Sequence, residues 1–459
     1  MESILGQKST TPESIFLNIL FDEFSSQGVR YAVMRNHDLL PFSAGGSDLD
    51  IIVAAEDGEL TKALVLRSIQ LAAGAPIGIA ESIGFFKVYA LGSAENYSYP
   101  WWGLRVDVNV GLFYKGHQLI AEGVHLPIRM NRNIAVLSDE LSGVLGVLKE
   151  VINNGTYPVR YSKFAKIAAL TEWTYIEMVL APMGKRALTL LKTMMLTATC
   201  NDKLHRECRE VRAAIFSQLF SRRAILSSLE RLQFEWSKIH RYLRPSGVWV
   251  AILGVDGSGK SSVINAILPA LNAATHNSVV LRHLRPALLP PIARLKGRKS
   301  LQVGPVLEPH GSTPSGKLGS IFRLAYLTLD YLAGYWLWTR VKIAKEPTVV
   351  IFDRYAYDMA IDPRRFRIGL PSWIAGWFVS LAPRPDLIIC LQGNPEVIAA
   401  RKRELSVEET RRQVDALRVF ANSEPRAVLI STDTSIEETR DRVLHAIVDY
   451  IQAKHQYNY

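Results

Sequence analysis

The residues GVDGSGKS at positions 254–261 have the spacing of a phosphate-binding loop, the Walker A pattern GxxxxGK[ST]. They lie between an apolar, β-branched segment and a helix-forming segment, which is the context that such a loop requires. Glycines let the loop curl until its backbone N–H groups face phosphate oxygens, and the helix N-terminus adds its positive dipole end. We expect Lys260 to bridge the β- and γ-phosphates of bound ATP and Ser261 to bind Mg²⁺. The predicted nucleotide-binding residues are Gly254, Asp256, Gly257, Ser258, Gly259, Lys260, Ser261 and Ser262.

A second part of this site is predicted where the apolar segment TVVIFD ends in Asp353. A carboxylate at a strand end can bind Mg²⁺ or orient an acceptor, and Arg354 beside it can neutralise charge on a transferring phosphoryl group. We therefore predict that Lys260, Asp353 and Arg354 are catalytic. An Asp-Arg pair that only caps the next helix is the structural alternative.

Three segments in the same order, GVDGSGKSS, VVIFDRY and PDLIICLQGNPEVIAARK, resemble the motifs of the thymidylate kinase family of P-loop nucleotide kinases. The resemblance covers about residues 247–455 and implies a doubly wound sheet, ATP as phosphoryl donor, Mg²⁺ and an arginine-rich lid. The lid matches RKRELSVEETRRQ, and a guanidinium can bind two phosphate oxygens at once. A solvated helix with Glu–Arg pairs would have the same pattern. The resemblance implies charge-stabilising roles for Arg401, Arg403, Arg411 and Arg412, of which we count Arg401 and Arg411 as catalytic.

The acceptor side departs from that family. Asp358 stands where a serine often follows the family's DRY, and Gln392 stands where an aspartate is usual, so thymidylate is not the expected acceptor. The stretch from Arg282 to Arg367 is instead rich in basic residues. Such residues suit an anionic acceptor, because arginine binds phosphate bidentately. A solvated basic loop is equally compatible. The basic residues are Arg282, Arg285, Arg294, Lys296, Arg298, Lys299, Arg323 and those of DPRRFR at 362–367. From this stretch we predict four substrate-binding residues: Arg285, Arg323, Asp358 and Arg364.

The N-terminal part carries a second candidate site, GGSDLDIIV, in which Asp48 and Asp50 leave the same face of a strand. Asp107 in LRVDVNV could join them from a neighbouring strand, and three carboxylates can bind one or two Mg²⁺ ions that align a nucleoside triphosphate. The arrangement resembles the minimal nucleotidyltransferase fold. That family has a Gly-Ser pair where this chain reads MRNHDLLP, although Arg35 and Asn36 could contact phosphate there. Aspartates of an inactive domain are the alternative.

Element patterns predict an α/β protein in three parts: a small mixed nucleotidyltransferase-like domain at 1–140, a helical segment at 141–245, and a P-loop domain with a doubly wound parallel sheet at 246–459. Residues 285–314 form an aperiodic Pro, Gly and Lys/Arg-rich segment that we interpret as a functional loop. The apolar run 321–338 is interrupted by two charges, so a buried helix is expected rather than a membrane span. Trp373, Trp377 and Phe378 are expected on a core helix, with a membrane-surface contact as the alternative.

Composition excludes several classes of protein. The 459 residues are 48% hydrophobic and 21% charged, which excludes a mostly disordered or collagen-like chain. Three separated cysteines offer neither a disulfide framework nor a zinc site, and no basic-then-apolar leader is seen, so a cytoplasmic location is expected. Residues 1–140 hold 16 acidic and 10 basic side chains, whereas the rest of the chain has a net charge of +17. That excess fits a phosphorylated substrate or a nucleic acid.

Three functions are compatible with these patterns. The first is an ATP-dependent phosphotransferase acting on a small anionic acceptor, such as a nucleotide or phosphorylated sugar, with a second nucleotidyltransferase activity in 1–140. The second is a nucleic-acid end-processing polynucleotide kinase, although the N-terminal part lacks a KxDG ligase motif. The third is a regulator that binds ATP without turnover. A homodimer is compatible with all three.

Overall fold

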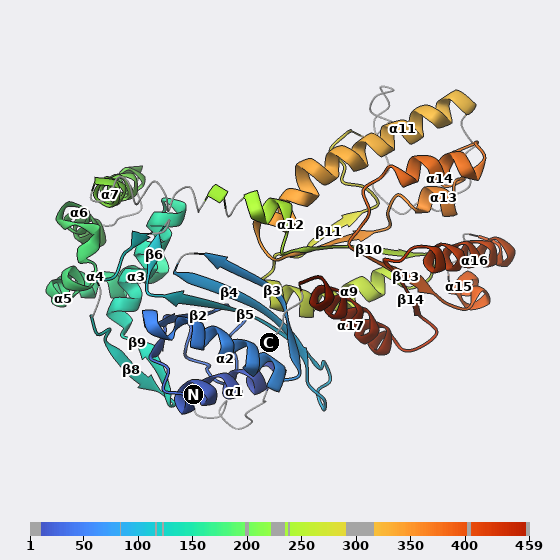
Figure 1. Ribbon diagram of the computed structural model, residues 1–459. Helices are drawn as coiled ribbons and strands as arrows, with labels where there is room; N and C mark the ends of the chain where they lie inside the picture. Colours follow the sequence, from blue (N-terminus) through green and yellow to red (C-terminus); the bar gives the residue numbers. More distant parts are fainter. Residues whose placement is uncertain are drawn as a thin grey trace. The chain divides into compact units, whose positions relative to one another are not determined.

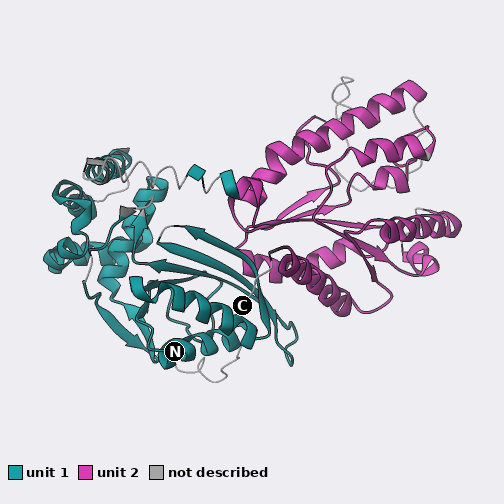
Figure 2. Cartoon of the chain, in the orientation of Figure 1, with its two compact units in different colours: residues 1–240, 459 teal, residues 241–458 magenta. Residues whose placement is uncertain are grey.

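The computed structural model describes residues 11–82, 84–114, 117–121, 124–197, 202–221, 235–236, 239–290, 316–401 and 405–455. The chain forms two compact units, unit 1 at 1–240 and unit 2 at 241–458 (Figure 2). Both combine helices with a β-sheet, so the α/β class predicted from the sequence is confirmed. The basic residues Arg294, Lys296, Arg298, Lys299 and Arg403 lie outside the described residues.

Unit 1 is built on a mixed seven-stranded sheet with the order β3-β4-β5-β2-β1-β9-β8 (Figure 1). Its central pair β2 and β5 is parallel, as is β1 with β9, whereas the other neighbours are antiparallel. A short β6–β7 ribbon is separate. The strands are β1 Tyr31–Val33, β2 Leu49–Val53, β3 Gly74–Ser82, β4 Phe85–Ser93, β5 Trp101–Val110, β6 Phe113–Tyr114, β7 His117–Gln118, β8 Ile128–Asn131 and β9 Ile134–Leu137.

Alternate residues of the central strands enter two different cores. Ile51 and Val53 pack with helices α1 (Pro12–Ser26) and α2 (Gly58–Leu71), whereas Ile52 packs with the helical segment on the other face. This follows from the two-residue period of a strand. A short 3₁₀ turn, η1 Ala55–Asp57, precedes α2.

The predicted helical segment is present. Its first helix, α3 (Asp139–Asn154), begins at Ser138, whose side chain accepts a 3.3 Å hydrogen bond from the Leu141 N–H, and it ends at Gly155 with φ +68°. Apolar residues at helical spacing bury one face of α3 against the sheet. The remaining elements are α4 Val159–Thr171, α5 Trp173–Val179, the turn η2 Ala181–Met183, α6 Lys185–Thr197 and α7 Asp202–Ser221.

Unit 2 has the predicted doubly wound parallel sheet, with five strands in the order β11-β12-β10-β13-β14. Trp249, Ala251 and Leu253 of β10 pack with helices α11, α12, α14 and α16, whereas α9 and α17 lie on the opposite face (Figure 1). The strands are β10 Val248–Gly254, β11 Val280–His283, β12 Val349–Asp353, β13 Leu387–Gln392 and β14 Ala427–Ser431. The helices are α9 Lys260–Thr275, α11 Lys317–Gly334, the π-helical turn η3 Tyr335–Thr339, α12 Arg340–Lys345, α13 Asp358–Ile361, α14 Ser372–Ser380, α15 Pro395–Arg401, α16 Val407–Ser423 and α17 Ile436–His455.

Two expectations about apolar helices are corrected. The run 321–338 is helical, but only one side is buried: Leu324 is fully covered, whereas Leu337 is 72% exposed. Likewise Trp373 and Trp377, which were expected in the core, are 73% and 57% exposed, whereas Phe378 is partly buried against the core. Each helix covers the sheet with one face, and an apolar composition does not determine what covers the other face.

Within the described residues, no helix combines the length and apolar character needed to cross a membrane. Cys208 and Cys390 are buried free thiols. The helical segment after residue 141 belongs to unit 1, and its independence as a domain stays a prediction.

Candidate functional site

The phosphate-binding loop joins β10 to α9 in unit 2. Gly257 and Gly259 have φ values of +87° and +86°, a conformation that favours glycine. A Cβ on Gly254 would lie 2.5 Å from the Ser258 Oγ and 3.0 Å from the Leu391 carbonyl oxygen, so a larger residue does not fit there. The glycines of the motif are therefore required by the backbone path itself.

Lys260 begins α9 and is buried, with 7% of its surface exposed. Its Nζ donates to the carbonyl oxygens of Gly254 (2.8 Å) and Val255 (2.9 Å), inside the curve of the loop. Burial, together with the nearby charge of Arg354, lowers the pKa of Lys260 to about 7. The nearby carboxylates of Asp256, Asp358 and Asp353 offset this effect only in part, and an anionic phosphate in the loop would favour the charged form further.

Asp353 ends β12 beside His283, which ends the neighbouring strand β11 in register with it. The His283 Nδ1 lies 3.1 Å from the Asp353 Oδ2, whereas the buried Asp353 Oδ1 has no hydrogen-bond partner among the described residues. Burial opposes ionisation, but the His283 hydrogen bond and the charge of Lys260 outweigh it and lower the pKa of Asp353. The unpaired Oδ1 and the hydroxyl of the exposed Ser261 are oxygen ligands of the kind that Mg²⁺ prefers, so these residues fit the ion.

Arg354 follows Asp353 and has a φ of +73°, which is unfavourable for a residue with a side chain. Its guanidinium donates to Asp256 in the loop and to the Asp358 Oδ1 at 3.2 Å. Arg365 donates to the other carboxylate oxygen of Asp256. Burial disfavours the charged carboxylate, but the charges of Arg354, Lys260 and Arg365 outweigh it and lower the pKa of Asp256 to about 2. Two guanidiniums therefore converge on the carboxylate of the phosphate-binding loop.

Asp358 and Arg285, which were predicted to bind the acceptor, both form ion pairs within unit 2. Asp358 is buried and accepts hydrogen bonds from Arg354 and the Tyr355 N–H (3.0 Å), so it holds the arginine in place. Arg285 donates to Asp330 at 3.1 Å, and that fully buried carboxylate also accepts from two backbone N–H groups of the segment after β11. The structure places Arg285 in a buried ion pair.

Two further arginines predicted to bind the acceptor, Arg323 and Arg364, form no hydrogen bond or ion pair with the phosphate-binding loop among the described residues. Arg364 is exposed, whereas its neighbour Arg365 reaches Asp256. Burial and the like charge of Arg367 lower the pKa of Arg323. The basic run 362–367 was recognised from the sequence, but spacing alone could not tell which arginine faces the loop.

The lid arginines lie on α15 and α16 and pair with surface glutamates. Arg411 donates to Glu396 at 2.5 Å, and Arg412 donates to Glu409 at 2.7 Å. Arg412 also donates to the Ile361 carbonyl oxygen at 3.2 Å, whereas Arg401 is exposed at the end of α15. In the part of the chain that the structure describes, none of these pairs involves the phosphate-binding loop.

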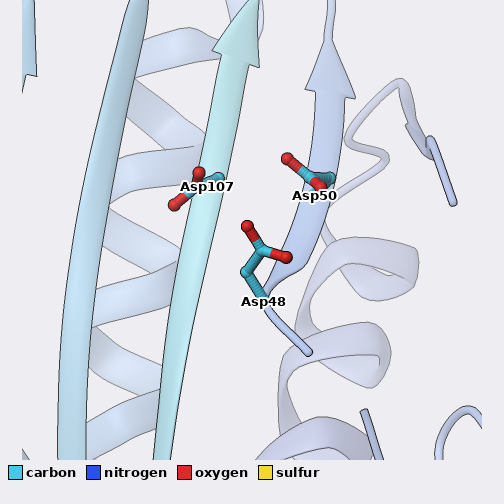
Figure 3. A group of neighbouring side chains, drawn as sticks. All are labelled: Asp48, Asp50 and Asp107. Carbon is cyan, nitrogen blue, oxygen red and sulfur yellow. The ribbon is translucent and has the colours of Figure 1, made fainter. Parts of the chain in front are cut away.

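In unit 1, the three predicted carboxylates converge. Parallel pairing of β2 with β5 places Asp50 opposite Asp107, and Asp48 lies two residues before Asp50 on the same side (Figure 3). Their carboxylate oxygens lie within 4.8 Å of one another, and all three residues are buried. We call Asp48, Asp50 and Asp107 the carboxylate cluster. Its convergence was predicted correctly, whereas Mg²⁺ at this position stays a prediction.

Four basic side chains contact the carboxylate cluster. Arg35 pairs with Asp50 and, at 3.4 Å, with Asp48. Burial, only partly offset by its cationic neighbours, raises the pKa of Asp107. Arg35 was identified from the sequence as a phosphate contact, whereas the other three were missed because strand register and packing bring them in. These are Arg105, which pairs with Asp48 and lies 2.9 Å from Asp107, Lys87, 3.4 Å from Asp107, and Lys149 of α3, 3.1 Å from Asp50.

No protein-family model matches the chain, and no curated protein matches it. Among solved structures, the thymidylate kinase from Ehrlichia chaffeensis aligns with 44% of this chain and 98% of its own length, at 14% identity and a TM-score of 0.31. A similarity at this level says nothing about the substrate of the present chain. The P-loop arrangement of unit 2 is instead seen in its parallel strand order and in the loop between β10 and α9.

Proposed function

We propose that unit 2 is an ATP-dependent kinase that transfers the γ-phosphoryl group to a small anionic acceptor, such as a nucleotide or a phosphorylated sugar. The observation that carries this proposal is the convergence of Arg354 and Arg365 on Asp256 beside Lys260. A loop that only binds ATP needs its lysine and glycines. A pair of guanidiniums next to that loop adds a place for a second anionic group.

In this proposal the donor phosphates lie in the curve of the loop, where Lys260 exchanges its two carbonyl contacts for phosphate oxygens. Asp353 and Ser261 would hold Mg²⁺, which when bound would neutralise phosphate charge. Arg354 and Arg365 bind the phosphate of the acceptor and direct one of its oxygens towards the γ-phosphorus.

Transfer of the γ-phosphoryl group needs no reactant besides ATP and the acceptor. A phosphate oxygen of the acceptor forms a bond to the γ-phosphorus, and the bond from the γ-phosphorus to the bridging oxygen breaks, so ADP leaves with that electron pair. A phosphate monoester is largely ionised at neutral pH, since its second pKa is about 6. No side chain is therefore needed to remove a proton. Lid arginines such as Arg411 would stabilise the charge spread over the transferring group.

An acceptor screen with γ-labelled ATP tests this proposal. We expect label to move to a nucleoside monophosphate or a sugar phosphate and to stay on ATP when Lys260 is replaced by alanine. Label on the 5′-hydroxyl of an oligonucleotide would favour the polynucleotide kinase instead. ATP that binds but is neither transferred nor hydrolysed with any acceptor would favour a regulator.

Nucleotidyl transfer in unit 1 is a separate hypothesis. It is supported by the convergence of the carboxylate cluster, whereas the four paired cations oppose it. Phosphoryl transfer should survive an Asp48→Asn/Asp50→Asn double variant if the two units work independently. Joint loss of both activities in folded protein would indicate one composite site.

A further inference from the structure

Beyond the kinase proposal, we propose that unit 1 binds a small organic anion with an apolar body, in the cavity next to the carboxylate cluster. In this proposal the three carboxylates orient cations towards the ligand, and no divalent metal is bound between them. The proposal rests on the charge balance of the cluster, the shape and lining of the cavity, and the surroundings of Arg212.

The charges around the cluster do not fit a divalent metal. Three carboxylates face four cations, so the group is already positive before any ion binds. Mg²⁺ would have to displace arginine and lysine contacts from buried oxygens, and the displaced cations would be left without partners. An anion, in contrast, is attracted by the net positive charge of the same group.

A cavity of about 430 Å³ lies beside the cluster, within the range of about 300–1,000 Å³ typical of small-molecule sites. Phe85, Phe113 and Leu148 are among its apolar residues, and Lys87, Asp107 and Lys149 connect it to the cluster. Asn109 and Asn153 add amide groups to the lining. Apolar side chains with a few polar groups at one end are suited to a ligand that has an apolar body and a polar group.

Arg212 of α7 gives the cavity a further positive charge. It lines the cavity, its buried Nε has no hydrogen-bond partner, and it forms no ion pair among the residues that the structure describes. Its guanidinium lies 5.9 Å from the ring of Phe216, which neutralises no charge. Of the three cations that line the cavity, Lys87 pairs with Asp107 and Lys149 pairs with Asp50, which leaves the Arg212 guanidinium as an excess positive charge. This excess assigns negative charge to the ligand.

Two fluorescent probes of nearly the same shape test the proposal on the full-length protein. 8-Anilinonaphthalene-1-sulfonate has an aromatic body and a sulfonate, whereas N-phenyl-1-naphthylamine has the same body without the charge. We expect Arg212→Gln to lower the affinity for the sulfonate probe by about 10-fold, which corresponds to the loss of one charged contact of about 1.4 kcal/mol. The affinity for the neutral probe should fall by less than about 2-fold. Phe85→Ala should lower the affinity for both probes.

Arg209→Gln is the matched control, because this arginine lies exposed on the same helix. It should leave the affinities for both probes unchanged. The proposal is overturned if Arg212→Gln and Phe85→Ala leave the affinity of the sulfonate probe unchanged, or if Arg212→Gln weakens both probes equally.

The metal-free part of the proposal has its own test. Mn²⁺ can be titrated into the Lys260→Ala protein without nucleotide and followed by electron paramagnetic resonance. We expect no bound Mn²⁺ that depends on the cluster. Stoichiometric Mn²⁺ binding that is lost in the folded Asp48→Asn variant would overturn this part and support the nucleotidyltransferase hypothesis.

Discussion

Arg354, at the end of β12, donates to Asp256 in the phosphate-binding loop, two segments that lie about 100 residues apart in the sequence. The same carboxylate accepts from Arg365. Asp256 thus holds two guanidiniums next to the loop before any ligand is present. Its proposed role is to position the groups that bind the acceptor.

Replacement of Asp256 by asparagine should therefore affect the acceptor more than ATP. The amide cannot balance two guanidiniums, so both arginines lose their fixed orientation. We expect the acceptor KM to rise about 10-fold or more, as for loss of a charge-assisted contact, with a smaller change in the ATP KM. Steady-state kinetics with each substrate varied in turn will separate the two. Equal changes in both values would contradict a positioning role.

Lys260→Ala should remove phosphoryl transfer by at least about 10²-fold, because the lysine stabilises charge on the transferring group. The fold should remain, since the buried ammonium is a cost to the free protein rather than a support for the core. Labelled-ATP turnover and the melting temperature measure the two effects. Lys342→Ala, an exposed lysine of α12, serves as a control. Full turnover in folded Lys260→Ala protein would contradict the kinase proposal.

ATP binding should be accompanied by proton uptake at Lys260. The pKa of about 7 in the free protein means that most of this lysine is neutral at pH 8, and phosphate favours the charged form. We expect nearly one proton to be taken up per ATP at pH 8 and much less at pH 6, where the lysine is already protonated. Calorimetric titration in buffers of different ionisation enthalpy measures this number. Lys260→Met should abolish the uptake, and an unchanged uptake would refute the assignment.

Asp353→Asn should reduce turnover by about 10²-fold or more and weaken its dependence on Mg²⁺, since the unpaired Oδ1 is the proposed ligand. His283→Ala should have a smaller effect, because it removes only a hydrogen bond from a largely exposed ring. Turnover measured over a range of Mg²⁺ concentrations distinguishes the two variants. An identical Mg²⁺ dependence in wild-type and Asp353→Asn protein would count against a metal role.

Arg411→Ala should lower kcat if the lid closes over ATP, because its contact with Glu396 must then be exchanged for phosphate. Arg442→Ala is a matched control, since that arginine also pairs with a surface glutamate, Glu438, on a helix. Hydrogen exchange in residues 405–413 should slow when ATP and acceptor are both present. Equal kinetics for both variants and unchanged exchange would favour a solvated surface helix.

The sequence predicted well those features that depend on local pattern. Glycine spacing identified the loop at 254–261, and alternating apolar residues identified the strands that carry Asp50 and Asp107. No strand was predicted at β3, whose residues GAPIGIAES include few with high strand propensity. The short strand β9 was also not predicted, although its residues IAVL favour a strand.

Two contacts that depend on packing were not predicted. Lys149 contacts Asp50 across 99 residues of sequence, and no spacing rule connects a helix residue to a strand so far away. His283 meets Asp353 only because β11 and β12 are neighbours in register. The exposure of Trp373 was predicted wrongly for a related reason. Whether a helix residue is buried depends on which other elements pack against that side of the helix.

The separate cores of units 1 and 2 have a consequence for thermal unfolding. Unit 1 buries two apolar clusters and unit 2 buries another that shares no residue with them, so we expect the two units to unfold in separate transitions. A ligand that binds one unit shifts only the transition of that unit, by mass action. Scanning calorimetry should thus resolve two heat-absorption peaks, and ATP with Mg²⁺ should move one of them while leaving the other at its original temperature.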